Sequence, residues 1–187
     1  YWRTTRAGLK LGSGLSDGVK LGFDTGFDSG STLDYVYRNQ PSGKSALGRM
    51  IDANYLNSIG WRGIRRRKVH AEELLRLAMG RLREAGRAVR IVDIAAGHGR
   101  YILESLEGQQ QRPDSILLRD YSDINVRDGS ALIAQKGLGD VARFDLVDGG
   151  GAEHGEHESA GELVVVVAGA VGDAGAAVHV FGVDLGE

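Results

Sequence analysis

Apolar residues recur with a helical period in two segments of the first half of the chain. Over 42–58 and again over 65–85 they return every three or four positions, which predicts two amphipathic helices. Ser42 is the expected N-cap of the first helix, and Gly86 is the expected stop of the second. Residues 7–30 are rich in Gly, Ser and Asp and predict a turn-rich arm. The apolar positions of the two helices are Ala46, Leu47, Met50, Ile51, Tyr55 and Ile59, then Val69, Leu74, Leu75, Ala78, Met79 and Leu82.

The pattern changes beyond residue 88. Three short runs rich in aliphatic residues, at 89–94, 115–120 and 141–147, predict strands, and helical segments at 100–107 and 123–136 separate them. Strands that alternate with helices are typical of a parallel sheet with right-handed crossovers. The sequence therefore predicts an α/β fold with a Rossmann-like, doubly wound and mostly parallel sheet, behind a helical and loop-rich N-terminal arm.

Composition changes again near Gly149. All 23 Lys and Arg residues lie in 1–148, whereas 149–187 is dominated by Gly, Ala, Val and acidic residues. We therefore predict three parts: an arm and helix over 1–62, a cofactor-binding core with the first three strands over 63–148, and a low-complexity tail over 149–187. Within the tail, the run Leu163-Val164-Val165-Val166-Val167 predicts either a fourth strand or an exposed edge that self-associates.

Overall composition removes several classes of protein. With 42% apolar and 26% charged residues the chain resembles an ordinary soluble domain, and without cysteine it has no disulfide, thiolate nucleophile or cysteine-ligated metal. A formal charge of -2 predicts no nucleic-acid partner. No run approaches the roughly 20 apolar residues of a membrane span, and no signal-peptide pattern is present, so we expect a cytoplasmic protein.

The segment Asp93-Ile94-Ala95-Ala96-Gly97-His98-Gly99 follows the first predicted strand. Open α/β sheets bind ligands at the carboxyl ends of their strands. Small residues there let the backbone approach a ligand, and the amides that open the next helix are hydrogen-bond donors. Asp120 ends the next strand, where a carboxylate can accept both hydroxyls of a ribose. The two acids predict a nucleoside pocket, and a plain tight turn is the alternative.

This glycine turn differs from the dinucleotide fingerprint Gly-x-Gly-x-x-Gly. Ala95 takes the first glycine position, and the third glycine is missing. The pattern therefore disfavours NAD and fits a methyl-donor nucleoside better.

The chain resembles the class I S-adenosylmethionine-dependent methyltransferases, whose first motif is an acidic residue followed by small residues, as in Asp93-x-Ala95-x-Gly97-x-Gly99. Within that class, it resembles more closely a bacterial methyltransferase family often found fused behind an α/β-hydrolase domain. The similarity covers roughly residues 1–148. It is carried by GFDSG at 26–30, LDYVYRN at 33–39, IGWRGIR at 59–65, IVDIAAGHGRY at 91–101 and LRDYSDIN at 118–125.

The resemblance implies S-adenosyl-L-methionine as cofactor. No metal site is predicted from the sequence. It places Asp120 at the ribose hydroxyls and Asp148 near the adenine amino group. It implies a fused or neighbouring α/β-hydrolase domain as a partner, and it names no methyl acceptor. It places Asp93, Ala95, Gly97 and Gly99 along the methionine and ribose part of the cofactor. We expect His98 and Tyr121, which adjoin these positions and Asp120, to be cofactor-binding as well.

The similarity ends where the composition changes. Family members continue with a fourth strand and three more, and residues 149–187 do not resemble them, so we expect a frameshifted or misassembled end and an incomplete sheet. The alternative to a methyltransferase is then a truncated, non-catalytic remnant that serves as an interaction or fusion segment.

Methyl transfer depends mainly on in-line orientation of the reacting groups, so few acid or base groups are needed. His98, Tyr35 and Tyr37 are the candidates for a base, and packing or anchoring roles are the more ordinary interpretation of each. No catalytic residue is assigned from the sequence.

Three further patterns favour ordinary interpretations. Ser42-Gly43-Lys44-Ser45 imitates the end of a phosphate loop, but Arg38 stands where that motif needs its first glycine. The basic run 65–68 is expected to be a solvated face, and the His and Glu residues of 153–158 lie in a glycine-rich setting that fixes no metal geometry.

Overall fold

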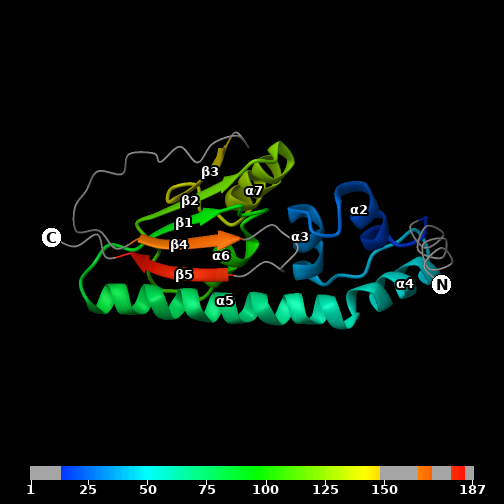
Figure 1. Ribbon diagram of the computed structural model, residues 1–187, viewed down its shortest axis with the longest axis horizontal. Helices are drawn as coiled ribbons and strands as arrows, with labels where there is room; N and C mark the ends of the chain where they lie inside the picture. Colours follow the sequence, from blue (N-terminus) through cyan, green and yellow to red (C-terminus); the bar gives the residue numbers. More distant parts are fainter. Residues whose placement is uncertain (1–13, 148–163, 170–177, 184–187) are drawn as a thin grey trace. The chain divides into compact units, whose positions relative to one another are not determined.

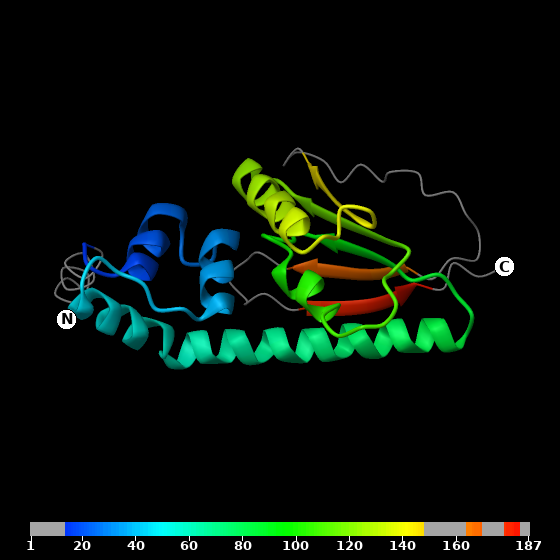
Figure 2. The same cartoon turned by 180° about the vertical axis from the view of Figure 1, so that it is seen from behind.

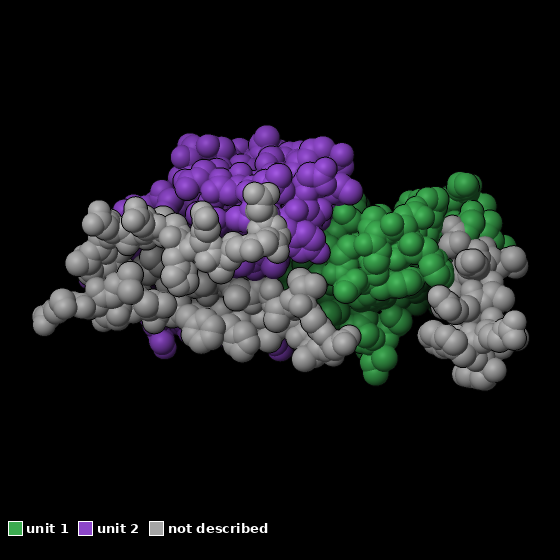
Figure 3. Space-filling model, turned by 45° about the horizontal axis from the view of Figure 1, so that its top comes forward, with its two compact units in different colours: residues 1–69 green, residues 70–187 purple. Residues whose placement is uncertain are grey.

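The computed structural model describes residues 14–147, 164–169 and 178–183. The chain forms two compact units, Tyr1–Val69 and His70–Glu187 (Figure 3). This division concerns packing alone, so the three functional parts expected from the sequence stay a prediction.

The first unit is helical (Figure 1). Tyr35, Val36 and Leu56 form its buried apolar cluster, and the partly buried Tyr55 and Trp61 pack against it. Its helices are α2 (Asp17–Thr25), α3 (Gly30–Arg38), α4 (Ala46–Leu56) and the first turns of α5 (Ile59–Glu84).

The expectation of a turn-rich arm over 7–30 is wrong for α2. Ser16 caps this helix, since its Oγ accepts a hydrogen bond from the Val19 amide at 3.1 Å. Gly18 lies at a close approach, because a Cβ there would be 2.6 Å from Cε1 of Tyr35. The glycine therefore serves helix packing rather than a turn.

The start and the buried side of α4 also differ from expectation. Ser45, not Ser42, is its N-cap. The buried positions are Gly48, Asp52 and Leu56, whereas the predicted apolar side is only partly buried: Tyr55 packs against the cluster, but Leu47 is 53% exposed and Met50 is 57% exposed. The helix turns this way because Asp52 accepts buried hydrogen bonds, so a polar residue lies at the centre of the buried side.

The long helix α5 begins at Ile59, six residues before the predicted start, and ends as expected. Gly86 has a positive φ of 68°, and the Arg87 amide donates to the carbonyl of Leu82 at 2.9 Å, which closes the helix. Leu75, Met79 and Leu82 are buried, whereas the predicted core positions Val69 and Leu74 are exposed. None of the helices in the described ranges has both the length and the apolarity to cross a membrane.

The second unit is built on a five-stranded sheet in the order β3-β2-β1-β4-β5 (Figures 1 and 2). The pairs β1–β2, β2–β3 and β1–β4 are parallel, which confirms the predicted α/β class with a mostly parallel sheet. Its elements are β1 (Arg90–Ile94), α6 (Arg100–Ser105), β2 (Ser115–Asp120), α7 (Asp123–Gln135), β3 (Ala142–Leu146), β4 (Val164–Gly169) and β5 (Val178–Val183).

The strand order follows the usual doubly wound pattern up to its fifth strand, but β5 pairs antiparallel with β4. Only residues 170–177 connect them, and a parallel crossover needs about a dozen residues or more. The valine run of the tail thus forms a strand inside the sheet, between β1 and β5, rather than at its edge.

Candidate functional site

The two acidic residues predicted to share a pocket point to the same face of the sheet. Asp93 of β1 is in register with Leu118 of β2, so their side chains lie on one face. Asp120 follows Leu118 by two positions and returns to that face. Asp93 is 0% exposed and Asp120 is 2% exposed. Two buried carboxyl groups therefore lie at the carboxyl ends of adjacent parallel strands.

Asp120 is surrounded by hydrogen-bond donors. Its Oδ2 accepts from the Gly97 amide at 2.8 Å, and its Oδ1 accepts from the Ser122 amide at 2.9 Å and from Nδ2 of Asn125 at 3.0 Å. A carboxylate has about four lone-pair directions, so these donors leave one for a further partner. Accepting both hydroxyls of a ribose would require one protein donor to move away.

The turn between β1 and α6 is held above Asp120 by the backbone. The Ala96 amide donates to the carbonyl of Arg119 at 3.0 Å, and the Gly97 amide donates to Asp120. Alternate residues of the turn have a positive φ: Ala95 at 60°, Gly97 at 59° and Gly99 at 67°. This conformation costs a non-glycine residue roughly 1–2 kcal/mol, so Ala95 is strained.

Gly99 adds a packing requirement to its conformational one. A Cβ at this position would lie 2.4 Å from Cδ1 of Leu118, on the strand below. Only glycine lets the turn lie this close to the sheet, and the small residues of the motif thus have a structural reason within the chain itself.

Asp93 has far fewer donors than Asp120. Its Oδ2 accepts the hydroxyl of Tyr101 at 2.7 Å, and its Oδ1 is buried with no hydrogen-bond partner among the described residues. Burial raises the pKa of Asp93 to about 8, the Tyr101 hydrogen bond opposes this rise, and the nearby Asp120 charge adds to it.

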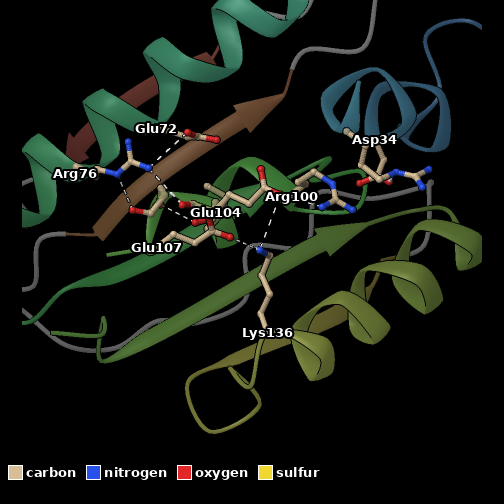
Figure 4. Close-up of polar contacts among 10 residues, drawn as sticks. Asp34, Glu72, Arg76, Arg100, Glu104, Glu107 and Lys136 are labelled. Atoms are coloured by element: carbon tan, nitrogen blue, oxygen red, sulfur yellow. Dashed lines mark hydrogen bonds and ion pairs between the residues drawn. The ribbon is translucent and has the colours of Figure 1, made fainter. Parts of the chain in front are cut away.

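Polar contacts fix α6, which carries Tyr101. Arg76 of α5 donates to the carbonyls of Ser105 at 2.9 Å and Glu104 at 3.3 Å (Figure 4). On the other side, Lys136 at the end of α7 pairs with Glu107 at 2.6 Å, and Arg100 pairs with Glu104 at 2.9 Å. The C-terminal end of the helix that brings Tyr101 to Asp93 is therefore fixed by contacts from α5 and from the end of α7.

The remaining predicted site residues are dispersed. His98 lies half-buried in the turn, Tyr121 is 63% exposed just after β2, and Asp148 lies outside the described residues.

The other two candidate bases belong to the first unit. Tyr35 is buried and donates to Asp52 at 2.5 Å, and burial raises its pKa well above the usual range, while Lys68 lies over the ring of Tyr37. Tyr35 thus takes the anchoring role.

The apparent phosphate-loop segment is also structural. Ser42 donates to Asp52 and Asp17, and Ser45 caps α4. In the basic run, Arg65 donates to the carbonyl of Leu56 at 2.8 Å, so this residue is not simply solvated. The His and Glu residues of 153–158 lie outside the described residues.

Tyr101 and Asn125 were missed from the sequence. Each lies in the first turn of the helix that follows a site strand, and each reaches back to the carboxylate of that strand. Their position is the signal that could have found them: each is a polar residue in the first turn of the helix that follows a strand with an acidic residue near its carboxyl end.

The residues present fit a ligand that carries hydrogen-bond donors. The buried Oδ1 of Asp93 is an acceptor without a protein donor among the described residues, and Asp120 retains one lone-pair direction. A nucleoside's hydroxyls and an amino acid's ammonium group are donors of the required kind.

Known proteins resemble this chain over part of its length. A protein of Escherichia coli (strain K12) described as "Uncharacterized protein YnbC" is 55% identical over 119 residues, which cover 64% of this chain and 20% of that protein. The chain thus spans about a fifth of the curated relative it matches.

Solved structures give weaker, partial matches. A protein described as "a putative sarcosine dimethylglycine methyltransferase" from Galdieria sulphuraria is 19% identical with a TM-score of 0.35, over 46% of this chain and 30% of that one. An O-methyltransferase family protein from Burkholderia thailandensis is 16% identical with a TM-score of 0.32, over 84% of this chain and 53% of that one.

A family model covers most of the chain. It matches residues 1–168, a range that includes the whole turn between β1 and α6 and both buried carboxylates. The chain belongs to the protein family described as "Putative methyltransferase".

Proposed function

We propose that the chain binds S-adenosyl-L-methionine at the carboxyl ends of β1 and β2 and takes part in methyl transfer to an acceptor. The observation that carries the proposal is the pair of buried carboxyl groups on one face, one of which has an oxygen without a donor in the described part of the chain. The strand order supports the location, because the order of the strands reverses between β1 and β4, and a doubly wound sheet binds ligands at the carboxyl ends of the strands beside such a point.

Each residue of the site has a role in binding. Asp93 and Asp120 accept donors of the cofactor, and the turn over Ala95, Gly97 and Gly99 brings the backbone close to it. When bound, the cofactor supplies a methyl group on a sulfonium that is already a good leaving group. The chain's own contribution is therefore orientation and exclusion of water rather than proton transfer.

Titration calorimetry with S-adenosylhomocysteine tests the proposal. We expect micromolar binding by the wild-type chain and its loss in Asp120→Ala, which removes the acceptor of the turn as well as that of the ligand. Asp140→Ala is the matched control, since Asp140 is exposed, pairs with Arg112 and precedes β3, so it does not lie at the carboxyl ends of the strands. Absence of binding at millimolar ligand would favour the remnant that acts as an interaction or fusion segment.

A further inference from the structure

The Asp93 carboxyl group is held asymmetrically. Both it and Tyr101 are buried, and the Tyr101 hydroxyl donates to Oδ2 alone, at 2.7 Å. The buried Oδ1 has no partner in the part of the chain that the structure describes. A buried acceptor without a hydrogen-bond donor destabilises the folded chain, so the arrangement is unfavourable unless that oxygen is used.

Tyr101 is well placed to fix this asymmetry. It lies at the second residue of α6, directly after Gly99 and Arg100, so the turn and the tyrosine are positioned together. The contacts of Arg76 and Lys136 at the C-terminal end of α6 limit its movement. A phenol in a fixed helix can hold one carboxylate oxygen and thereby set the rotation of the whole group.

We propose that Tyr101 is a positioning residue for the cofactor: its hydroxyl fixes the Asp93 carboxylate so that Oδ1 is presented to a hydrogen-bond donor of the bound nucleoside amino acid. The proposal rests on the proposed function, because it concerns the use of the same site. Tyr101 does not react and acts only through Asp93.

Binding through Asp93 should depend on pH. The groups that face Asp93 are Tyr101 from α6, which favours the ionised carboxylate, and Asp120 from β2, which disfavours it. Without the Tyr101 hydroxyl, the ionised form loses its protein donor and the pKa of Asp93 rises further above 8. More of the carboxyl group is then protonated near neutral pH, and binding to a donor weakens there.

The test is the affinity of the full chain for S-adenosylhomocysteine between about pH 6 and pH 9. We expect wild-type affinity to increase through about pH 8, the midpoint of Asp93 ionisation, and to approach a plateau near pH 9. Tyr101→Phe should weaken binding about tenfold at pH 7, the result expected if the pKa of Asp93 rises by about one, and should recover most of that loss at pH 9.

Two controls separate positioning from structure. Asp140→Ala alters an exposed residue that pairs with Arg112 and should leave the profile unchanged. In Asp93→Asn the affinity should no longer depend on pH. The double variant Asp93→Asn with Tyr101→Phe should show no pH dependence either. If Tyr101→Phe fails to remain folded, NMR titration of the Asp93 carboxyl group in Tyr101→Met without ligand gives the same comparison. A midpoint above that of the wild type supports the role, and an unchanged or lower midpoint contradicts it.

The outcomes distinguish the two proposals. A wild-type chain that does not bind the ligand contradicts the proposed function and, with it, this inference. A wild-type chain that binds, together with a Tyr101→Phe variant whose affinity falls equally at every pH or not at all, overturns the inference alone.

Discussion

Asp52 in the helical unit and Asp93 in the sheet unit are both completely buried, yet the protein surrounds them differently. Asp52 accepts four hydrogen bonds: from Ser16 Oγ at 2.6 Å, the Gly18 amide at 2.8 Å, the Tyr35 hydroxyl at 2.5 Å and the Ser42 amide at 2.9 Å. Within the described residues, Asp93 accepts one hydrogen bond, from Tyr101, and its Oδ1 has no donor.

The difference separates two uses of a buried carboxyl group. Asp52 joins α2, α3, α4 and the segment before α4, so its oxygens are satisfied by folding itself. Asp93 is left partly unsatisfied by folding, which is typical of a group whose remaining partner comes from outside the chain. Four substitutions test this difference between the two units.

Asp52→Ala should have the largest effect on stability. It leaves buried donors from four positions without an acceptor, and breaking such a buried network costs about 3–5 kcal/mol. Chemical denaturation should show this loss, while Asp24→Ala, at an exposed residue paired with Lys20, should change the free energy of unfolding by less than about 1 kcal/mol. A small loss of unfolding free energy in Asp52→Ala would show that the hydrogen bonds of Asp52 do not stabilise the helical unit, and would contradict the contrast with Asp93.

Asp93→Asn should stabilise the folded chain, and the size of this gain should depend on pH. The folded pKa of about 8 lies above the ordinary value of 3.8, so the folded state holds a proton that the unfolded state releases between those values. Wild-type stability therefore falls as pH rises through this window, by about 1.4 kcal/mol for each pH unit at most.

The asparagine variant lacks this titration and should gain stability relative to the wild type between pH 5 and pH 8. Denaturation curves at the two pH values check the sign. Parallel pH dependence in the two proteins would show that Asp93 does not titrate in the folded chain.

Gly99→Ala should destabilise the sheet unit through both conformation and packing. Its φ of 67° disfavours alanine, and the new Cβ would meet Leu118 at 2.4 Å, for a combined loss of about 2–4 kcal/mol. Gly108→Ala is the matched control, because φ there is 76° and no atom lies within 4 Å of an added Cβ. Equal losses in the two variants would show that the turn does not press on Leu118.

Ala95→Gly should have the smallest effect. Relief of the strained φ of 60° favours glycine by about 1–2 kcal/mol, and the greater freedom of glycine in the unfolded chain offsets roughly 0.5–1 kcal/mol of this. The melting temperature should rise slightly, whereas Ala96→Gly, at a residue without positive φ, should lower it. A decrease in both variants would contradict the strain at Ala95.

Local signals were sufficient for much of the sheet unit. The aliphatic run at 115–120 coincides with β2, Ser122 caps α7, and Gly86 and Gly137 have the positive φ expected of helix stops. Each of these features depends on a few neighbouring residues, as the predicted strand at 115–120 and the predicted stop at Gly86 show.

Long-range contacts could not be predicted in this way. The exposed side of α4 follows from the donors that converge on Asp52 from Ser16, Tyr35 and Ser42, and no periodicity within 42–58 encodes them. In the same way, the positions of Asp93 and Asp120 at strand ends were predictable, whereas the donors from Tyr101 and Asn125 were not. The use of these carboxylates by a cofactor stays a prediction.

A crystal structure of the chain grown with S-adenosylhomocysteine tests the central claim most directly. We expect the ligand at the carboxyl ends of β1 and β2, with one of its donors within about 3.2 Å of Asp93 Oδ1. A ligand bound elsewhere, or one bound there with Oδ1 still lacking a donor, would contradict that claim.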